Sequence, residues 1–383
     1  MIYLDYNATT PLCGPARDAM RPYLEEHFGN PSSIHAAGRE ARAAIDDARD
    51  RLAHLLGAKP HELIFTGSGT EANNLAVLGL ARANRTRGNH LICSSTEHHA
   101  VLHAFEHLQK HEGSEATFLR VDSLGRVDPH DLAAAIRDET TLVSIMLANN
   151  ETGVIQPMRQ ISEVCRARGV LLHSDMVQAF GKLEIDLSLV DAASFAAHKF
   201  YGPKGAGLLY LRAGLPIESI QFGGAHENQR RPGTENVAAI AGMAAAAEWA
   251  LDGMASEQQR EAALRDSLWE SVREPAQQNG DSEHRIANTL NVSFPGLDSE
   301  TILMALDLEG ICASSGSACM VGSVVASHVL LAMGAPQEIA RSAIRFSFGK
   351  QTTADETEAA GHAIARVMQR LTKAASRVEY AVA

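Results

Sequence analysis

The sequence has neither a long apolar run nor a basic cluster. No stretch approaches the roughly 20 consecutive apolar residues of a membrane-spanning helix, and residues 1–5 resemble no part of a signal peptide. No run of five or more Lys or Arg occurs, and the formal net charge of −12 disfavours binding to the phosphates of nucleic acids. We therefore expect a cytoplasmic protein that binds no membrane and does not bind nucleic acid directly.

Cysteine is also scarce. The five cysteines stand at irregular spacing and include no Cys-x-x-Cys pair, so the pattern lacks the signature of a zinc site or of a disulfide scaffold. The sequence shows no internal repeat and no low-complexity linker. We expect reduced thiols and no metal site.

The composition itself is that of an ordinary globular protein. With 383 residues, 45% of them hydrophobic, the chain can bury one large core and one smaller core. In the first two-thirds, short apolar runs alternate with helical patterns, and strands are expected at residues 63–65, 91–93, 142–147, 170–172 and 207–211. Residues 41–55 have apolar positions at helical spacing before Gly57. This alternation predicts an α/β fold, with a mainly parallel sheet flanked by helices.

The last third has a different pattern. An alanine-rich segment, Val237 to Ala250, predicts a buried helix that closes the first domain, and a polar helix is expected after it at residues 258–274. Strands are expected at residues 289–294 and 344–348, and a capping box at residues 353–356 predicts a final helix that reaches about Ala375. We predict a large domain of residues 15–255 and a smaller α+β domain built from residues 1–14 and 256–383.

Residues 66–74 have the pattern of an anion-binding turn. They follow a predicted strand and open an amphipathic helix, so that glycines let the backbone approach a ligand while helix amides and hydroxyls face an anion. The segment lacks the lysine of a P-loop and the glycine spacing of a dinucleotide fingerprint. A plain tight turn is an equal alternative for this segment alone.

Two further polar residues extend this pattern. Asp175 ends a predicted strand, where α/β sheets place ligands, and a carboxylate there can keep a pyridine nitrogen protonated. Gln178 can donate to a ring hydroxyl; capping of a following helix is the alternative role of Asp175. Lys199 follows His198 further along the chain. A phosphate cup, a carboxylate and a lysine together match the needs of pyridoxal 5'-phosphate, which a lysine holds covalently.

Cys319 lies among small residues in the segment 315–319. Taken alone it is most often a buried small side chain. A cysteine nucleophile together with a cofactor-binding lysine indicates sulfur chemistry on an amino acid.

Several segments, in order along the chain, resemble those of one enzyme family. They are residues 3–5, 7–11, 29–35, 96–98, 149–153, 231–236, 315–319 and 344–347. In these segments the chain resembles the cysteine desulfurases of the NifS and IscS group, which are class-V aminotransferases with the fold-type I architecture of pyridoxal-phosphate enzymes. The resemblance covers nearly the entire chain.

The resemblance implies roles for individual residues. Gly69, Thr70 and His198 are expected at the cofactor phosphate, and His98 is expected to stack on the pyridine ring and to take the proton of the Cys319 thiol. Asn150 is expected near the ring hydroxyl and the substrate carboxylate, which Arg345 binds through its planar fork. Taken alone, His98 is most often a structural histidine, and a structural ion pair is an equal alternative for Arg345. Thr234 is expected to reach the phosphate from a second subunit, which implies a homodimer.

The reaction implied is conversion of L-cysteine to L-alanine. The sulfur is transferred to Cys319 as a persulfide and then passes to an acceptor protein. Iron-sulfur cluster assembly, thionucleoside synthesis and DNA phosphorothioation all draw on this chemistry, and the sequence does not choose among them. The alternatives are a lyase of selenocysteine or cysteine sulfinate, which runs without Cys319, and a weakly catalytic sulfur-relay scaffold.

The chain departs from the family pattern at two places in the expected cofactor pocket. Ala196 stands where the family usually has a serine, which removes one hydroxyl from the phosphate cup. Met176 stands where a smaller residue is usual and is expected to tighten the pocket floor. The segment after Cys319 is also more apolar than in the family, and we expect it to rest against protein.

Overall fold

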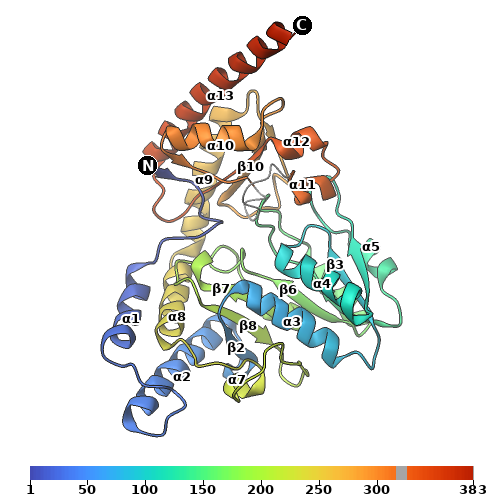
Figure 1. Ribbon diagram of the computed structural model, residues 1–383, viewed down its shortest axis with the longest axis vertical. Coiled ribbons are helices and arrows are strands. Elements are labelled where there is room, and N and C mark those ends of the chain that lie inside the picture. The colour runs from blue at the N-terminus through green and yellow to red at the C-terminus, as the bar shows by residue number, and fades with distance from the viewer. Residues whose placement is uncertain (316–325, 383) are drawn as a thin grey trace.

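The computed structural model describes residues 1–315 and 326–382, with the side chains up to Lys373. It forms two lobes, with the larger one below and the smaller one above in Figure 1. A seven-stranded sheet crosses the larger lobe, and its spatial order is β2-β8-β7-β6-β5-β3-β4. In that order the strands are Leu63–Thr66, Gly207–Leu211, Ala192–Ala196, Leu171–Asp175, Thr140–Ser144, His90–Ser94 and Glu115–Leu119.

The sheet is mainly parallel, as the sequence predicts. Every neighbouring pair from β7 to β4 is parallel, whereas β8 is antiparallel to both β7 and β2. The link between β7 and β8, residues 197–206, contains only the short 3₁₀ turn η3 (Ala197–Lys199). Because a parallel return needs a longer crossover, this short link forces β8 to run in the opposite direction.

Strands β4 and β7 have no counterpart in the sequence-based prediction. In β4 the side chains are mostly exposed or half-buried, as expected of a strand at the sheet edge, so no buried apolar run marks it. In β7 the sequence Ala-Ala-Ser-Phe-Ala is fully buried, but its small residues give a weak strand signal.

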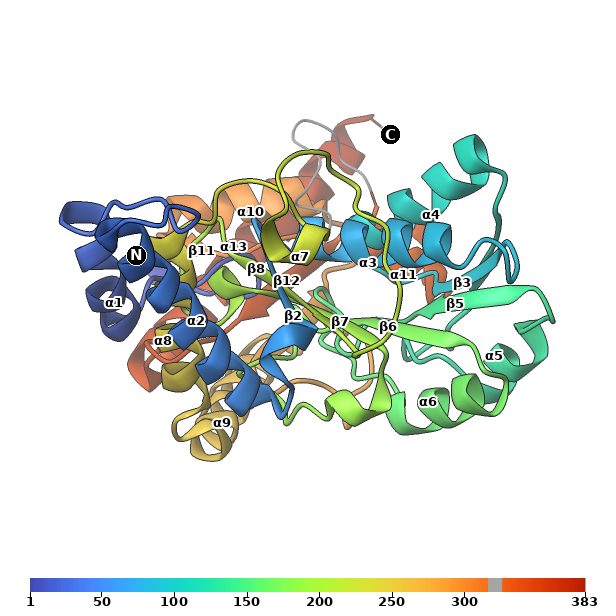
Figure 2. The ribbon, with the colours of Figure 1, turned by 90° about the horizontal axis from the view of Figure 1, so that it is seen from below.

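Helices cover both faces of this sheet (Figure 2). On one face lie α3 (Gly69–Ala83) and α4 (His99–Glu112); on the other lie α2 (Ala36–Leu56), α5 (Pro129–Ala135), α6 (Met158–Ala167) and α8 (Val237–Leu251). Adjacent strand residues point to opposite faces, so Leu171 packs with the α3 and α4 side while Leu172 packs with the other core. The expectation of helices on both faces is confirmed.

Helix α2 ends as the sequence predicts. Gly57 has a left-handed backbone, with φ at 66°, and its N–H closes the last helical turn, which is the role that glycine fills at low conformational cost. Helix α8 is buried in the core, also as predicted. It packs against α1 (Gly14–Glu25) so closely that a Cβ on Gly242 would lie 2.6 Å from Cγ of Met20. The short helix α7 (His226–Gln229) lies in the loop before α8.

The smaller lobe has its own sheet and its own core. Strands β9 (Gln277–Gln278), β10 (Thr289–Ser293) and β12 (Ala343–Ser347) form an antiparallel sheet, and β1 (Ile2–Tyr3) pairs with β11 (Ile311–Cys312). The helices of this lobe are α9 (Met254–Val272), α10 (Ser299–Leu308), α11 (His328–Ala332), α12 (Gln337–Arg341) and α13 (Ala354–Val382). Leu4 packs in this core together with Leu290 and Ile344, whereas Tyr6 and Cys13 pack in the core of the larger lobe.

Helix α13 begins at the predicted capping box. The backbone N–H of Glu356 donates to Thr353 Oγ1 at 3.2 Å, and the N–H of Thr353 donates to Glu356 Oε2 at 3.0 Å. This reciprocal pair satisfies two free donors at the helix start. The helix continues past the predicted end near Ala375 and projects from the body of the molecule (Figure 1).

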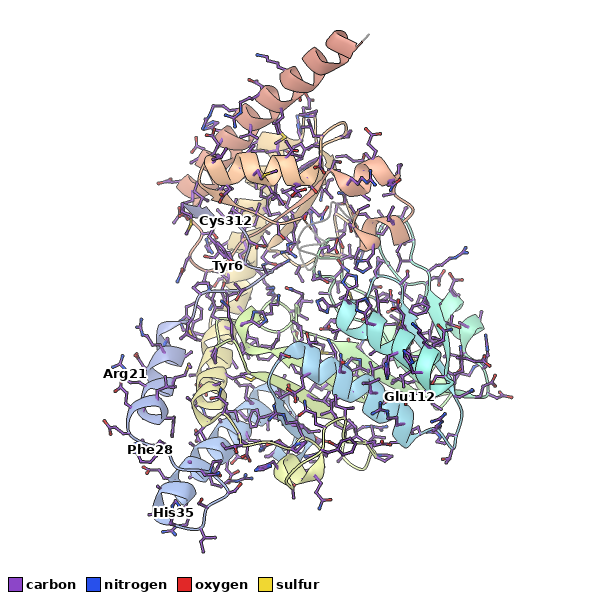
Figure 3. All side chains as sticks on the ribbon, in the orientation of Figure 1. Tyr6, Arg21, Phe28, His35, Glu112 and Cys312 are labelled. Carbon is purple, nitrogen blue, oxygen red and sulfur yellow. The ribbon has the colours of Figure 1, made fainter. Side chains whose placement is uncertain are left out.

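The N-terminal segment passes between the two lobes at Tyr6, which is labelled in Figure 3. A Cβ on Gly349 would lie 2.2 Å from Cδ1 of Tyr6, so the tyrosine ring requires glycine there. The domain boundaries after residues 14 and 255 stay a proposal. Among the described residues no single helix is long and apolar enough to cross a membrane, and only the bent pair α8 and α9, at 72° to each other, meets the length and composition criteria together.

Candidate active site

A cavity of about 350 Å³ lies at the junction of the lobes. Its wall contains most of the predicted site residues: Gly69, Thr70, His98, Asn150, Asp175, Gln178, His198, Lys199 and Arg345. These residues come from the starts of α3 and α4, from strands β6 and β12, and from turns. The fold therefore brings together residues that are far apart in the sequence.

The start of α3 forms one end of the cavity. Ser68 caps the helix, because its hydroxyl accepts the N–H of Glu71 at 3.1 Å, and Ser68, Gly69 and Thr70 all line the cavity. A Cβ on Gly69 would lie 2.8 Å from Cγ2 of Val177, so only glycine allows the backbone this close approach. The helix start thus offers amides and hydroxyls to an anion, as the sequence pattern predicts.

Asp175 ends β6 and is buried. Its Oδ2 accepts Asn73 Nδ2 at 2.6 Å and its Oδ1 accepts the N–H of Val177 at 2.9 Å. The residues after Asp175 form a turn and no helix, so the alternative that Asp175 caps a helix is wrong. Two donors hold the carboxylate at the cavity wall, where it can face a protonated ring nitrogen.

Lys199 stands at the end of the turn η3. Its Nζ donates to the carbonyl oxygens of Asn7 at 2.6 Å and Ala8 at 2.8 Å. Next to it, His198 contacts Thr9 Oγ1 through Nδ1 at 3.2 Å. Burial, together with the neighbouring Lys199, lowers the pKa of His198 to about 4. His198 is therefore neutral at physiological pH.

His98 caps α4 from the other side of the cavity. Its Nδ1 accepts the N–H of Ala100 at 3.1 Å, so the proton of the neutral ring sits on Nε2. Burial lowers its pKa; Asp175 acts against this shift, while Lys199 and His328 add to it. In this arrangement His98 presents a donor to the cavity.

Arg345, on β12, brings a cation from the smaller lobe. Its Nη1 donates to the carbonyl of Asn150 at 2.8 Å and its Nη2 to Asp5 Oδ1 at 2.7 Å. Its Nε is buried and has no hydrogen-bond partner among the described residues. A carboxylate that entered the cavity would meet a guanidinium with spare donor capacity.

The sequence analysis did not assign a role to Asn7, which the structure places at the centre of the site. Asn7 is buried, and its backbone and side chain contact both lobes. Its amide donates to Thr289 Oγ1 at 2.8 Å, and its N–H donates to Ser347 Oγ at 2.9 Å. Its carbonyl accepts Lys199 Nζ and Gln178 Nε2. The only signal in the sequence was its place in a segment of the family pattern.

Asn73 is a second residue that the sequence analysis left without a role. It stands one turn into α3, on the side that faces Asp175, and its Oδ1 is buried without a partner among the described residues. The sequence pattern of residues 66–74 predicted a helix here, but it did not predict the contact between Asn73 and β6.

Of the remaining predicted residues, Thr234 lies outside the cavity wall. Thr234 is exposed and lines a neighbouring hollow together with Gly67 and Arg231. Cys319 lies outside the described residues. Ser314, which is the residue before its segment, pairs with Arg345 of the cavity wall through two backbone hydrogen bonds.

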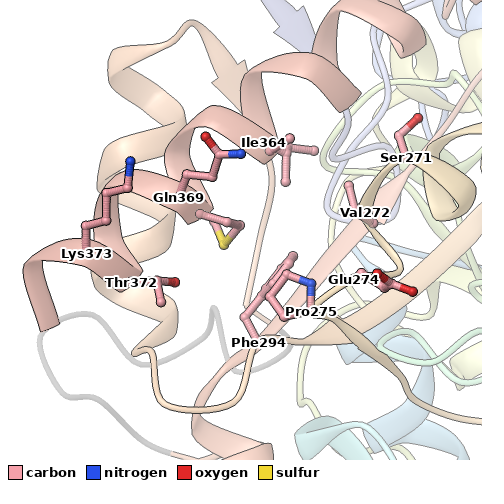
Figure 4. A pocket seen from close by; sticks show the side chains of 11 residues that line it. Ser271, Val272, Glu274, Pro275, Phe294, Ile364, Gln369, Thr372 and Lys373 are labelled. Atoms are coloured by element: carbon pink, nitrogen blue, oxygen red, sulfur yellow. The ribbon is translucent and has the colours of Figure 1, made fainter. Parts of the chain in front are cut away.

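The two departures from the family pattern also lie near this cavity. Ala196 lines it and is buried, and a Cβ on Gly69 would lie 3.1 Å from the Ala196 Cβ. Met176 is buried in the main core and does not line the cavity. A second hollow, of about 300 Å³, lies in the smaller lobe beside α9 and α13 (Figure 4) and contains none of the predicted residues.

The residues of the cavity fit pyridoxal phosphate. The close approach at Gly69 and the hydroxyls of Ser68 and Thr70 suit a phosphate, the buried Asp175 suits a pyridinium nitrogen, and Lys199 supplies the amine. Among the described residues, no group of three or more His, Cys, Asp or Glu side chains could hold a metal ion.

Comparisons with known proteins identify the family. Residues 2–359 match the aminotransferase class-V family. The chain is 46% identical over 375 residues to "Cysteine desulfurase IscS" of Dictyoglomus turgidum, which covers 97% of this chain and 95% of that protein.

Two solved structures extend the likeness to the fold. A "NIFS-LIKE PROTEIN" superposes with a TM-score of 0.90 and 35% identity, over 97% of this chain and 99% of that one. The structure "SspA in complex with cysteine" has a TM-score of 0.81 and 32% identity, over 91% and 99%. This chain therefore belongs to the class-V aminotransferase family, among its pyridoxal-phosphate-dependent cysteine desulfurases.

Proposed function

We propose that this chain removes the sulfur of L-cysteine, releases L-alanine and holds the sulfur as a persulfide on Cys319. The main support is the single cavity that joins Lys199, Asp175, the start of α3 and Arg345. One solved structural neighbour has cysteine bound. Pyridoxal phosphate, when bound, supplies an electron sink that weakens the bonds at the substrate α and β carbons.

Residues of the chain supply the remaining functions. Arg345 binds the substrate carboxylate, because each Nη group carries a second N–H besides the one that it donates to Asn150 or Asp5. Lys199 holds the cofactor and moves the α-proton, because its amine reaches the cavity beside the carbonyls of Asn7 and Ala8. Asp175 keeps the ring nitrogen protonated.

The transfer of sulfur to Cys319 requires no added oxidant. The Cys319 thiolate attacks the substrate sulfur, so that a sulfur-sulfur bond forms and the carbon-sulfur bond breaks. The electron pair of the broken bond stays on the carbon fragment, which takes up a proton and becomes alanine. The thiolate is the reactive form.

His98 is the proposed acceptor of the thiol proton. With Nδ1 engaged by Ala100 and the ring proton on Nε2, the neutral ring takes up this proton only when the Ala100 bond at Nδ1 breaks. We propose that this exchange at the start of α4 accompanies the sulfur step.

We also propose a homodimer in which Thr234 of one subunit reaches the phosphate of the other. Thr234 is exposed and lies outside the cavity of its own chain. Phe28, Ile34 and Phe222 are 87%, 92% and 95% exposed in the single chain, and exposed apolar residues of this size mark interaction surfaces. A cytoplasmic location and an acceptor protein for the sulfur remain expectations.

A direct experiment separates this function from its alternatives. Purified protein loaded with pyridoxal phosphate is expected to form alanine from L-cysteine and to release sulfide under a thiol reductant, in equal amounts. Preferential turnover of selenocysteine or cysteine sulfinate would favour the lyase. Cofactor binding without turnover of any of the three would favour the relay scaffold.

A further inference from the structure

A second lysine lies behind the cavity wall. Lys182 follows the turn after β6 and does not line the cavity. Its Nζ donates to Gln178 Oε1 at 2.9 Å and to Asn7 Oδ1 at 3.3 Å. Asn7 Oδ1 also accepts Asn288 Nδ2 at 3.1 Å. Two lysines thus share Asn7: Lys182 binds its side chain, and Lys199 binds its backbone carbonyl.

The contact between Lys182 and Gln178 fixes which way the amide points. A glutamine amide can flip its oxygen and nitrogen at little intrinsic cost, and its partners decide the orientation. Here Oε1 accepts a hydrogen bond from Lys182 Nζ, and Nε2 faces the carbonyl of Asn7 at 2.9 Å, which can only accept. Both contacts select one orientation, in which the amide presents an N–H donor at the cavity wall.

The surroundings of Lys182 make this contact costly to maintain. Burial lowers the pKa of Lys182 to about 7; Glu261 acts against this shift, and Lys199 and Arg345 add to it. Burial raises the pKa of Glu261, on α9, to about 8. The backbone carbonyl of Lys182 accepts Gln258 Nε2, also on α9, at 2.5 Å. A methionine would occupy about the same volume as Lys182 and would bring no positive charge near Lys199 and Arg345.

We propose that Lys182 is a positioning residue that holds Gln178 with its N–H toward the cofactor, and that its effect on cofactor binding runs through this amide. The inference rests on the proposed function, because it concerns the cofactor of that site. It assigns to Lys182 no contact with substrate or cofactor.

A double-mutant cycle tests the inference. The variants are Lys182→Met, Gln178→Ala and the double variant, with Lys110→Met on the exposed surface of α4 as the matched control. Two quantities are measured: the rate at which cofactor leaves on dialysis, and the pH midpoint of the cofactor absorbance band. The melting temperature of the cofactor-free protein reports whether a variant has merely lost stability. Lys182→Arg, which keeps the donors, serves as the rescue.

Lys182→Met is expected to release cofactor about tenfold faster, since a charge-assisted hydrogen bond that fixes a ligand-binding amide is lost. The absorbance midpoint is expected to move to higher pH, because a donor to the anionic ring oxygen is no longer held in place. Gln178→Ala is expected to show both effects, and the double variant to differ little from Gln178→Ala. Lys110→Met is expected to behave like the parent, and Lys182→Arg to recover most of the loss.

Two results would overturn the inference. One is a Lys182→Met variant that keeps the cofactor and the absorbance midpoint of the parent. The other is a double variant whose losses are the sum of the single losses, since Lys182 would then act independently of Gln178. A parent protein that binds no pyridoxal phosphate would instead refute the proposed function, so the two failures are distinguishable.

Discussion

Arg345, in the wall of the cavity, forms an ion pair with Asp5, with Nη2 of the arginine 2.7 Å from Oδ1 of the aspartate. The arginine comes from β12, and the aspartate lies just after β1 in the N-terminal segment. A substrate carboxylate that binds Arg345 must share the guanidinium with this resident carboxylate. Asp5 therefore lowers the net positive charge available to the substrate.

Asp5→Asn keeps an oxygen that accepts the Arg345 hydrogen bond but removes the competing charge. We expect the KM for L-cysteine to fall by roughly two- to fivefold, which is the range of a partly exposed ion pair. Arg345→Lys, which loses the planar fork, is expected to raise KM by more than about tenfold. Steady-state kinetics at matched cofactor content measure both. A rise in KM for Asp5→Asn would show that Asp5 mainly orients the arginine.

Lys199→Ala is expected to abolish covalent attachment of the cofactor and to lower alanine formation by more than about a hundredfold, because the variant lacks the amine that moves the proton. The absorbance spectrum and an alanine assay measure the two effects. Lys204→Ala, an exposed lysine in the same link, is the control and is expected to resemble the parent. Retained attachment in Lys199→Ala would show that another lysine, such as Lys204, holds the cofactor.

Cys319→Ser is expected to keep the cofactor and to bind L-cysteine, but to yield neither persulfide nor appreciable alanine. Serine cannot accept a sulfur atom from the substrate. Mass spectrometry of the protein after one turnover detects the persulfide, and Cys312→Ser provides the matched control. Near-normal desulfuration by Cys319→Ser would move the assignment to the lyase class or to another cysteine.

Ala196→Ser is expected to slow cofactor loss on dialysis by about tenfold, because a hydroxyl added at the cavity wall gives the phosphate one more donor. The chemical step is expected to change little, since the phosphate does not react. Ala196→Val adds bulk without a donor and separates the two effects. Unchanged or faster loss from Ala196→Ser would argue against a phosphate cup that lacks one hydroxyl.

The buried side chain of His173 makes the stability of the folded protein depend on pH. It is buried between Ser144 Oγ at 2.8 Å and Ser194 Oγ at 3.0 Å, and burial lowers its pKa from 6.5 to about 3. Below pH 6.5 the unfolded chain binds a proton that the folded chain does not, so stability falls as the pH drops through this interval. The expected slope is at most about 1.4 kcal/mol per pH unit for this group.

Urea unfolding of the cofactor-free protein between pH 7.5 and pH 4.5 measures this slope. His173→Asn removes the titrating group and is expected to give a shallower decline than the parent, although its stability at pH 7.5 is lower. Equal slopes for the two proteins would show that His173 makes no contribution to the pH dependence.

The sequence predicted much of the site because most of its polar residues end or begin regular elements. Asp175 ends a strand and Thr70 starts a helix, so patterns of apolar residues located both. Asn7 escaped prediction because it lies in an irregular segment whose partners, Ser347 and Lys199, come from distant parts of the chain. No local pattern encodes such contacts.

The strands of the fold likewise divide into those that the sequence predicted and those that it did not. Buried apolar strands such as β6 were found from their runs, whereas the edge strand β4 and the small-residue strand β7 were not. The reversed direction of β8 follows from the link at residues 197–206, which is too short for a parallel crossover. The length of this link could be judged only once β7 was known. Local periodicity gives element types, but the pairing of strands depends on their spatial neighbours.

The contact between Asn7 and Ser347 also sets a time order for biosynthesis. Asn7 leaves the ribosome among the first residues, yet its partners Thr289 and Ser347 are translated near the end. At synthesis rates of about 5–20 residues per second, these partners follow roughly 15–70 s later. The nascent large lobe therefore carries Lys199 before the carbonyls that hold its amine are fixed in place, and we expect cofactor binding to mature only when the chain is almost complete.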